Sequence, residues 1–330
     1  MEKNDSWDLD SEYLDTKKFP PIKLIDASLV PEINLSPPDK NSYYKYWQDF
    51  PNITNSGFID NGLIDNKPLE PEILVIPDVH GRDFWKSSIV HWSQYEKIIF
   101  LGDYLDPYKD EGIDVLTAIE NFKWIINHKK TLKDKVVLLL GNHDLPYYSQ
   151  KYYDDCKPWC GFSRYSYDYA KEIKEIFAEN KDLFTLVHIQ DDIIFSHAGF
   201  RQWWVDFVNS YSGETNIYID TDDINNFLET NKLLTSDRIG LLSICSYERG
   251  GLYRHKNGSC VWADAHEYLY DDPLDKYKQI FGHTLQYYIQ EHNGQIEYLF
   301  DNPIVEKHYM CLDNGHAHIV DAKNFKLIDL

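Results

Sequence analysis

The central part of the sequence contains five short polar motifs, and each carries a residue type that can bind a metal. They are DVH at 78–80, GDYLD at 102–106, GNHD at 141–144, SHAG at 196–199 and GHT at 282–284. Aspartate, asparagine and histidine supply oxygen and nitrogen ligands without thiolate. Such a set favours manganese, iron or zinc over calcium or a structural four-cysteine site. The motifs therefore predict a transition-metal centre.

The spacing of these residues fits two metal ions. Asp78 and His80 are two residues apart, so both can point the same way at the end of a strand. Asp103 has two carboxylate oxygens, which it can share between two metals. One carbonyl and two imidazoles would complete the second site, from Asn142, His197 and His283. Two metals about 3.5–4 Å apart can hold both oxygens of a phosphoryl transfer and lower the pKa of a bridging water toward ~7.

Apolar segments precede the motifs and predict the elements that position them. Strands are expected at 72–78, 97–103 and 134–142, and apolar steps of three and four predict an amphipathic helix over 112–130. Strand, helix and strand in this order indicate a βαβ unit with a parallel sheet. Ligands bind at the carboxyl ends of strands in such sheets, so we expect the motifs to converge there.

The rest of the chain gives a coarser prediction. A helix is expected over 165–184, a hairpin around Asp191 and Asp192, and short strands after residue 295 that form a second sheet. Half of the 14 prolines lie in residues 1–70. We therefore expect an extension over 1–70, packed on or tethered to a domain at 71–330.

Some other metal-competent residues are open to a simpler interpretation. Cys156 and Cys160 have no second cysteine pair and are interpreted as ordinary thiols. His316 and His318 compete with His283 as ligands. However, the Asp-Asn-Gly sequence at 313–315 predicts a hairpin turn before them, so His283 is preferred.

In this order, the five motifs resemble those of the calcineurin-like metallophosphoesterases, and most closely their phosphoprotein phosphatase branch, the serine/threonine phosphatases. The resemblance covers about residues 78–284. It implies a four-layer α/β/β/α sandwich and a phosphomonoesterase that uses two metal ions, Mn, Fe or Zn, and a bridging hydroxide. It also implies that Asp78, His80 and Asp103 hold the first metal, and that Asp103 bridges to the second.

The resemblance further implies roles in proton transfer. His143 matches the family's histidine that is thought to protonate the leaving alkoxide. Asp106 or Asp144 could orient His143 and raise its pKa. The family's GDxxD motif favours Asp106.

The phosphate-binding arginines are less well defined. The family branch usually has an arginine directly after GDxxD, but here Pro107 and Tyr108 follow. Arg249 is the candidate for a second phosphate-binding arginine, with Arg254 as the reserve. Arg82 could replace the missing arginine.

Composition limits the function further. The chain has 330 residues with 33 basic and 54 acidic side chains, a net charge of −21, and is 43% hydrophobic. A surface this negative repels phosphate backbones and anionic headgroups, so nucleic acids are not expected as partners. The longest aliphatic runs are too short to span a membrane. Five cysteines without a disulfide framework, and an acidic N-terminus without an apolar signal segment, predict the cytoplasm.

Three functions remain open at this point. The first is hydrolysis of a phosphomonoester on a protein or a small molecule. The second is hydrolysis of a nucleotide or dinucleoside polyphosphate, or of a phosphodiester. The third is a scaffold that keeps the fold without catalysis, which is disfavoured because every expected ligand type is present.

Overall fold

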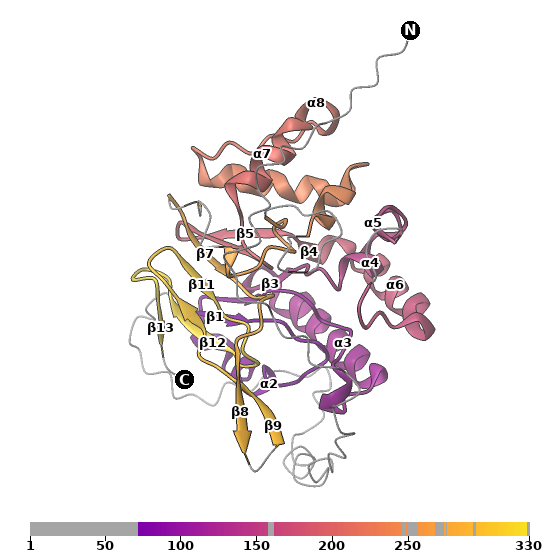
Figure 1. The fold of residues 1–330 in the computed structure, drawn as a ribbon, viewed down its shortest axis with the longest axis vertical. Coiled ribbons are helices and arrows are strands. Elements are labelled where there is room, and N and C mark those ends of the chain that lie inside the picture. Colours follow the sequence, from indigo (N-terminus) through magenta and orange to yellow (C-terminus); the bar gives the residue numbers. More distant parts are fainter. Residues whose placement is uncertain are drawn as a thin grey trace, which may run out of the picture. The chain divides into compact units, whose positions relative to one another are not determined.

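The computed structural model describes residues 72–157, 162–245, 249, 257–267, 274, 276–292 and 295–328. The extension predicted over 1–70 lies outside these residues. Within them the chain forms two β-sheets, a separate two-stranded hairpin, and helices packed around the sheets (Figure 1).

The first sheet is, in spatial order, β13 (Lys326–Ile328), β12 (His318–Asp321), β1 (Glu72–Ile76), β2 (Lys97–Phe100), β3 (Val136–Leu139) and β4 (Phe184–Thr185). The second is β10 (Ile304–Val305), β11 (Tyr309–Cys311), β7 (Lys278–Phe281), β6 (Ile193–Ser196) and β5 (Val187–Gln190). The hairpin is β8 (Tyr287–His292) and β9 (Gln295–Phe300). Strands β1 to β4 run parallel, as do β6, β7 and β11.

The α-helices are α2 (Lys86–Ile89), α3 (Val115–Leu132), α4 (Leu145–Tyr148), α5 (Gln150–Cys156), α6 (Ala170–Glu179), α7 (Gln202–Ser210) and α8 (Ser212–Thr215). The longest 3₁₀ segment is η8 (Ile224–Thr235). The longest described helix, α3, has 18 residues. No helix in the described part of the chain has the length and apolar character needed to cross a membrane.

Strand β1 shows why the two sheets lie face to face. Every residue from Ile73 to Ile76 is fully buried, so both faces of the strand are covered. Leu74 and Ile76 pack in a cluster with α3 residues such as Phe122. Ile73 and Val75 point the other way and pack with Phe195 of β6. A strand buried on both faces requires a continuous apolar run, which the sequence supplies.

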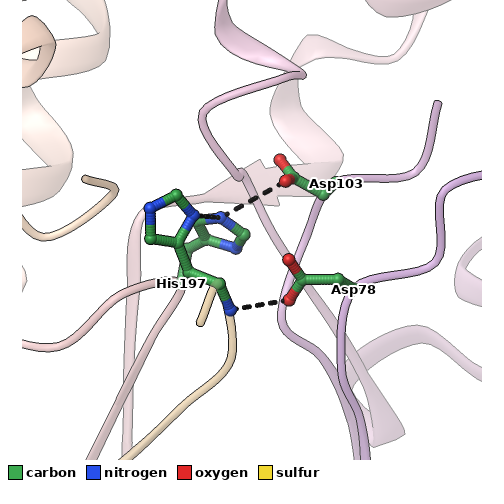
Figure 2. Close-up of side chains that lie close together, drawn as sticks. Asp78, Asp103 and His197 are labelled. Atoms are coloured by element: carbon green, nitrogen blue, oxygen red, sulfur yellow. Dashed lines mark hydrogen bonds and ion pairs between the residues drawn. The ribbon is translucent and has the colours of Figure 1, made fainter. Parts of the chain in front are cut away.

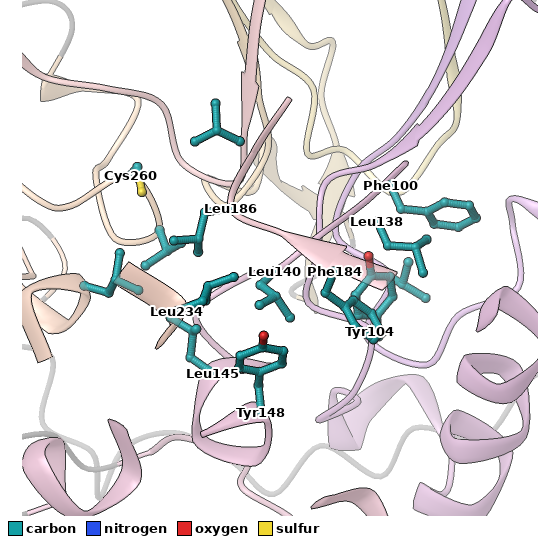
Figure 3. Packing of buried hydrophobic residues seen from close by; sticks show 14 of the residues in the cluster. Phe100, Tyr104, Leu138, Leu140, Leu145, Tyr148, Phe184, Leu186, Leu234 and Cys260 are labelled. Carbon is teal, nitrogen blue, oxygen red and sulfur yellow. The ribbon is translucent and has the colours of Figure 1, made fainter. Parts of the chain in front are cut away.

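The outer faces of both sheets are covered by helical segments. Helix α3 packs on the first sheet, where Tyr104, Phe100 and Phe184 lie in the same core (Figure 3). On the second sheet, Ile194 points outward into a cluster that contains Trp204 of α7 and Phe227 of η8. The order is helix, sheet, sheet, helix, which confirms the predicted α/β/β/α sandwich.

The predicted elements need two corrections. The helix predicted over 165–184 is shorter, because α6 begins at Ala170 and ends at Glu179. Phe184 is instead a strand residue that pairs with Leu138 of β3. The strands predicted after residue 295 also do not share one sheet, because among the described residues β9 pairs only with β8. β12 joins the first sheet antiparallel to β1, whereas β11 joins the second sheet next to β7. Short strands gain their hydrogen bonds by extending sheets that already exist.

Other predictions are confirmed. The helix expected over 112–130 is α3, with Asp114 as its N-cap. The hairpin expected around Asp191 and Asp192 connects β5 to β6, and both aspartates have the positive φ that a tight hairpin turn requires.

Candidate metal centre and active site

The five polar motifs lie in loops that leave the carboxyl ends of parallel strands. β1 leads to Asp78 and His80, β2 to Asp103 and Asp106, and β3 to Asn142 and His143; on the second sheet β6 leads to His197 and β7 to His283. Parallel neighbours end at the same edge, so both sheets present these side chains at one place. Figure 2 shows Asp78, Asp103 and His197 pointing toward one another from separate strands.

A buried cluster of two carboxylates and two imidazoles forms the centre of this site. One potential ligand atom from each of Asp78, Asp103, His197 and His283 lies within 4.8 Å of the others. The His283 backbone N–H donates to Asp78 Oδ1 at 2.8 Å, which ties the loops after β1 and β7 together. This group brings together four of the six predicted ligands.

The remaining two predicted ligands border this cluster. His80 Nε2 lies 3.5 Å from Asp103 Oδ2 and 4.0 Å from Asp78 Oδ2. Asn142 Oδ1 lies 2.9 Å from His197 Nε2. The fold therefore brings all six residues together.

The hydrogen bonds of two histidines test whether a cation fits here. His80 Nδ1 lies 2.9 Å from the Leu105 carbonyl, and His197 Nδ1 lies 2.9 Å from the Leu101 carbonyl. A carbonyl only accepts, so each Nδ1 carries a proton, and Nε2 is the ring nitrogen left to bind a metal. Both Nε2 atoms lie 3.5 Å from the Asp103 carboxylate. Carboxylate oxygens and imidazole nitrogens that converge in this way can surround a cation, so the residues fit a metal.

Burial and neighbouring charges shift the pKa values of these residues in different directions. Burial raises the pKa of the Asp78 carboxyl, and the neighbouring Asp103 carboxylate raises it further, as expected where carboxylates share a site. Burial alone would also raise the pKa of Asp103, but His197, His143 and His80 outweigh it and hold that pKa at about 2. Burial lowers the pKa of His80 and of His283, which keeps both imidazoles neutral and able to bind a metal.

His143 lies beside the cluster with its own carboxylate partner. His143 Nδ1 is 3.0 Å from Asp106 Oδ2, and Tyr147 donates its hydroxyl to Asp106 Oδ1 at 2.6 Å. Burial would lower the pKa of His143, but Asp103 and the hydrogen bond to Asp106 raise it. The alternative partner Asp144 does something else, because its carboxylate accepts from the backbone N–H groups of Asp103 and Gly141. Of the two carboxylates, Asp106 is the one that contacts His143.

The arginines differ in their relation to the site. Arg249 lines the cavity above the cluster and donates from Nη2 to the His283 carbonyl at 2.9 Å. Arg82 is paired instead with Glu111 through two hydrogen bonds of 2.8 and 2.6 Å, and does not line that cavity. Arg254 lies outside the described residues.

Arg164 is a site residue that the sequence analysis did not identify. Its Nη2 lies 3.1 Å from His143 Nε2 and 3.5 Å from His80 Nε2. Its guanidinium lies over the Tyr108 ring, 3.6 Å from the centroid, and it lines the cavity. No motif surrounds Arg164 in the sequence, so only the fold reveals its position. It lies beside Tyr108, which is the second residue after the GDxxD motif.

The cavity has a volume of about 300 Å³, and Tyr108, Trp262 and Ser163 also line it. Several residues in and beside this cavity have a strained backbone. His80, Asp103, Asp106 and His283 all have φ between 44° and 64°, as does Arg164 at 58°. Non-glycine residues rarely adopt this conformation, and it clusters at functional sites because the surrounding structure must enforce it.

An α/β sandwich with a buried Asp/His cluster at the strand ends, able to hold metal, defines the metallophosphoesterase class. The model of the family described as calcineurin-like phosphoesterase matches residues 71–320, so the chain belongs to this family and is a phosphoester hydrolase. No curated protein matches the sequence.

Solved structures of phosphatases are similar to the chain at low identity. One is a protein serine/threonine phosphatase from Saccharomyces cerevisiae with similarity to human phosphatase PP5. It has 13% identity and a TM-score of 0.42, and the match covers 77% of this chain and 74% of that one. Another is a mutant of a cold-active protein tyrosine phosphatase, with 12% identity, a TM-score of 0.37 and coverage of 76% and 74%.

Proposed function

We propose that the protein hydrolyses phosphomonoesters at a centre of two metal ions. The observation that carries this proposal is the pair of imidazoles, His80 and His197, which use Nδ1 on backbone carbonyls and whose Nε2 atoms converge on the Asp103 carboxylate. Asp103 lies between the two histidines, which suits a bridging ligand. The first metal would be held by Asp78, His80 and Asp103, and the second by Asp103, Asn142, His197 and His283.

Metals of the type that suits these ligands, Mn, Fe or Zn, supply Lewis-acid activation of water and of phosphoryl oxygens. The residues of this chain orient the ligands and exclude water. The Leu101 and Leu105 carbonyls fix the ring orientation of His197 and His80. The burial of the cluster excludes bulk water, which strengthens each electrostatic contact within it.

His143 is the proposed general acid. The Asp106 carboxylate accepts from Nδ1 and leaves Nε2 facing the cavity, from which a proton can reach the leaving oxygen. Tyr147 fixes the carboxylate of Asp106. Asp106 is thus a positioning residue that acts through the imidazole.

Arg249 and Arg164 are the proposed phosphate-binding residues. Both line the cavity, from the second-metal side and from the His143 side respectively. In this proposal Arg164 turns from His143 Nε2 to the phosphoryl oxygens, which frees Nε2 to carry its proton. Two guanidinium groups match the dianionic charge of a monoester.

The proposed substrate is a phosphorylated protein or small molecule in the cytoplasm, as in the serine/threonine phosphatase branch that the motifs resemble. A nucleotide or dinucleoside polyphosphate hydrolase, or a phosphodiesterase, is the alternative within the same family. A panel of phosphoesters assayed with Mn, Fe, Zn or Mg distinguishes them.

Metal analysis of the Asp103→Asn variant tests the centre itself. The wild-type protein should hold two metal ions per chain, and the variant should lose occupancy at both sites because one carboxylate serves both. Full occupancy together with undiminished activity in this variant would refute the dinuclear proposal.

A further inference from the structure

A second cavity adjoins the candidate active site and is lined mainly by apolar side chains. Its volume is about 420 Å³. The apolar residues come from the loop after Asp106, from the start of α3 and from the 3₁₀ turn before α6. They are Pro107, Ile113, Val115, Leu116 and Tyr169.

The two cavities share a boundary at the proton-transfer residues. Arg164 lines both of them. Pro107 lines the second cavity and the next residue, Tyr108, lines the first. Ser166 lines the second cavity, and its hydroxyl lies 3.4 Å from Asp106 Oδ1. The second cavity therefore begins beside the Asp106–His143 pair.

We propose that this second cavity binds the alcohol portion of the phosphoester, and that this portion is apolar. The inference rests on the proposed function, because it takes His143 as the proton donor. His143 Nε2 faces Arg164, and Arg164 borders the second cavity. A leaving oxygen that is protonated from Nε2 directs the rest of the alcohol toward this side.

The chemistry of the lining supports an apolar occupant. Leu116 is 53% exposed, and it forms a continuous apolar lining with Ile113 and Val115 that an occupant would cover. The carboxylate of Asp114 is already used, since it accepts from the backbone and hydroxyl of Thr117 as the cap of α3. The cationic groups at the rim, Lys109 and Arg164, disfavour a positively charged alcohol.

Two substrates with leaving groups of similar acidity test the proposal. Phenyl phosphate and 4-biphenylyl phosphate differ mainly in the length of their apolar portion. We expect the metal-loaded full-length protein to hydrolyse the biphenylyl ester with about tenfold higher kcat/KM, because the second ring buries additional apolar surface. Leu116→Gln should lower kcat/KM about fivefold more for the biphenylyl ester than for the phenyl ester. Leu228→Gln is the matched control, because Leu228 is exposed and lines neither cavity.

Calorimetric binding of phenylphosphonate and 4-biphenylylphosphonate separates this inference from the proposed function. Tighter binding of the biphenylyl compound that Leu116→Gln weakens supports the cavity, even if neither ester is hydrolysed. Failure to hydrolyse either ester would contradict the proposed function alone. Equal binding of the two phosphonates and equal kcat/KM for the two esters would overturn the cavity proposal, as would an equal effect of Leu116→Gln on both compounds.

Discussion

At the scale of single residues, hydrogen bonds decide which nitrogen of each histidine is free to act. His80 and His197 use Nδ1 on backbone carbonyls, and His143 uses Nδ1 on Asp106. In all three rings Nε2 is the atom that faces the site. The same arrangement serves two proposed roles, because a backbone carbonyl fixes the tautomer that turns Nε2 toward a metal, whereas the Asp106 carboxylate also favours the protonated form of His143.

The first prediction concerns His143. Replacing it by glutamine should lower kcat by roughly 10²–10⁴ with both metals retained, because the leaving oxygen then departs without a proton. The loss should be smaller for nitrophenyl phosphate, whose leaving group needs no proton. Steady-state kinetics with nitrophenyl and alkyl phosphates measure this. If both substrates lose activity equally, His143 is a structural residue.

A second prediction concerns Arg164. Arg164→Ala should lower kcat/KM for phosphomonoesters by roughly 10–100-fold, through the loss of a charge-assisted contact with the phosphate. Arg164→Lys should recover only part of this loss, because an ammonium cannot reproduce the guanidinium fork. Arg238→Ala serves as the control, since Arg238 is an exposed arginine paired with Glu214. Wild-type kinetics in Arg164→Ala would exclude a phosphate-binding role.

Residues in motifs could be predicted from the sequence, whereas Arg164 could not. Asp78, Asp103 and Asn142 each come two or three residues after a strand, so the sheet largely determines their position. Arg164 comes before η6 (Tyr167–Tyr169) and reaches His143 only because the chain returns over the site. The pairing of Arg82 with Glu111 is equally invisible in the sequence.

At the scale of elements, the loops that hold the ligands pack against one another with little space between them. A Cβ atom added at Gly141 would clash with the Asp103 carboxylate, and one at Gly282 would clash with that of Asp78. The Asp144 carboxylate joins the loop after β2 to the loop after β3. The positions of the proposed metal ligands therefore depend on small residues in neighbouring loops.

Gly141→Ala provides the third prediction. The added methyl group should displace Asp103, lower metal affinity roughly 10–100-fold, and destabilise the fold by about 1–3 kcal/mol. Gly213→Ala is the matched control, because nothing lies within 4 Å of a Cβ atom there. Metal titration and thermal unfolding measure both effects. Unchanged metal affinity in Gly141→Ala would show that Asp103 does not need this space.

Strand β5 provides a fourth prediction, on stability. Burial lowers the pKa of His188 to about 4, and Lys97 adds to this, although a hydrogen bond with Gln190 offsets part of it. The unfolded chain binds the proton near pH 6.5, so between pH 6.5 and 4 it holds more protons than the folded chain. His188 therefore does not reduce the free energy of unfolding above pH 6.5. As the pH falls from 6.5 toward 4, that free energy decreases because the unfolded chain binds the proton more readily.

His188→Gln should remove this part of the acid sensitivity, roughly 1–2 kcal/mol between pH 7 and pH 4. Urea unfolding at several pH values measures it, with His91→Gln at an exposed histidine as the control. The same pH slope in His188→Gln and in the wild type would contradict the prediction.

The sequence predicts the strands and α3 well, because their apolar runs and helical periodicity are local properties. It predicts the partners of the C-terminal strands poorly. β12 and β11 are both short, and nothing within either strand indicates which sheet it extends. That choice depends on which sheet edge is open when the chain returns, which is a property of the whole domain.

At the scale of the whole molecule, the net charge of the chain is opposite in sign to the charge that the candidate site gathers. The chain has a net charge of −21, yet its cavity collects Arg249 and Arg164 beside a cluster that fits metal cations. We expect a long polyanion, which contacts a wide surface, to be repelled by it, whereas a small phosphoester would contact only the local positive charge. The contrast between the surface and the cavity thus predicts a limit on the size of an anionic substrate.

The last prediction follows from this contrast. DNA and RNA should be poor substrates, and monoesters should be preferred over diesters in kcat/KM, because a monoester dianion presents two charges to the arginines and metals and a diester presents one. Added salt should reduce the repulsion of nucleic acids without restoring their hydrolysis to the level of monoesters. Kinetics with nitrophenyl phosphate and bis-nitrophenyl phosphate, at low and high salt, measure the preference. Arg249→Ala should lower activity on the monoester more than on the diester, and a diester hydrolysed faster than the monoester by the wild type would favour the phosphodiesterase alternative.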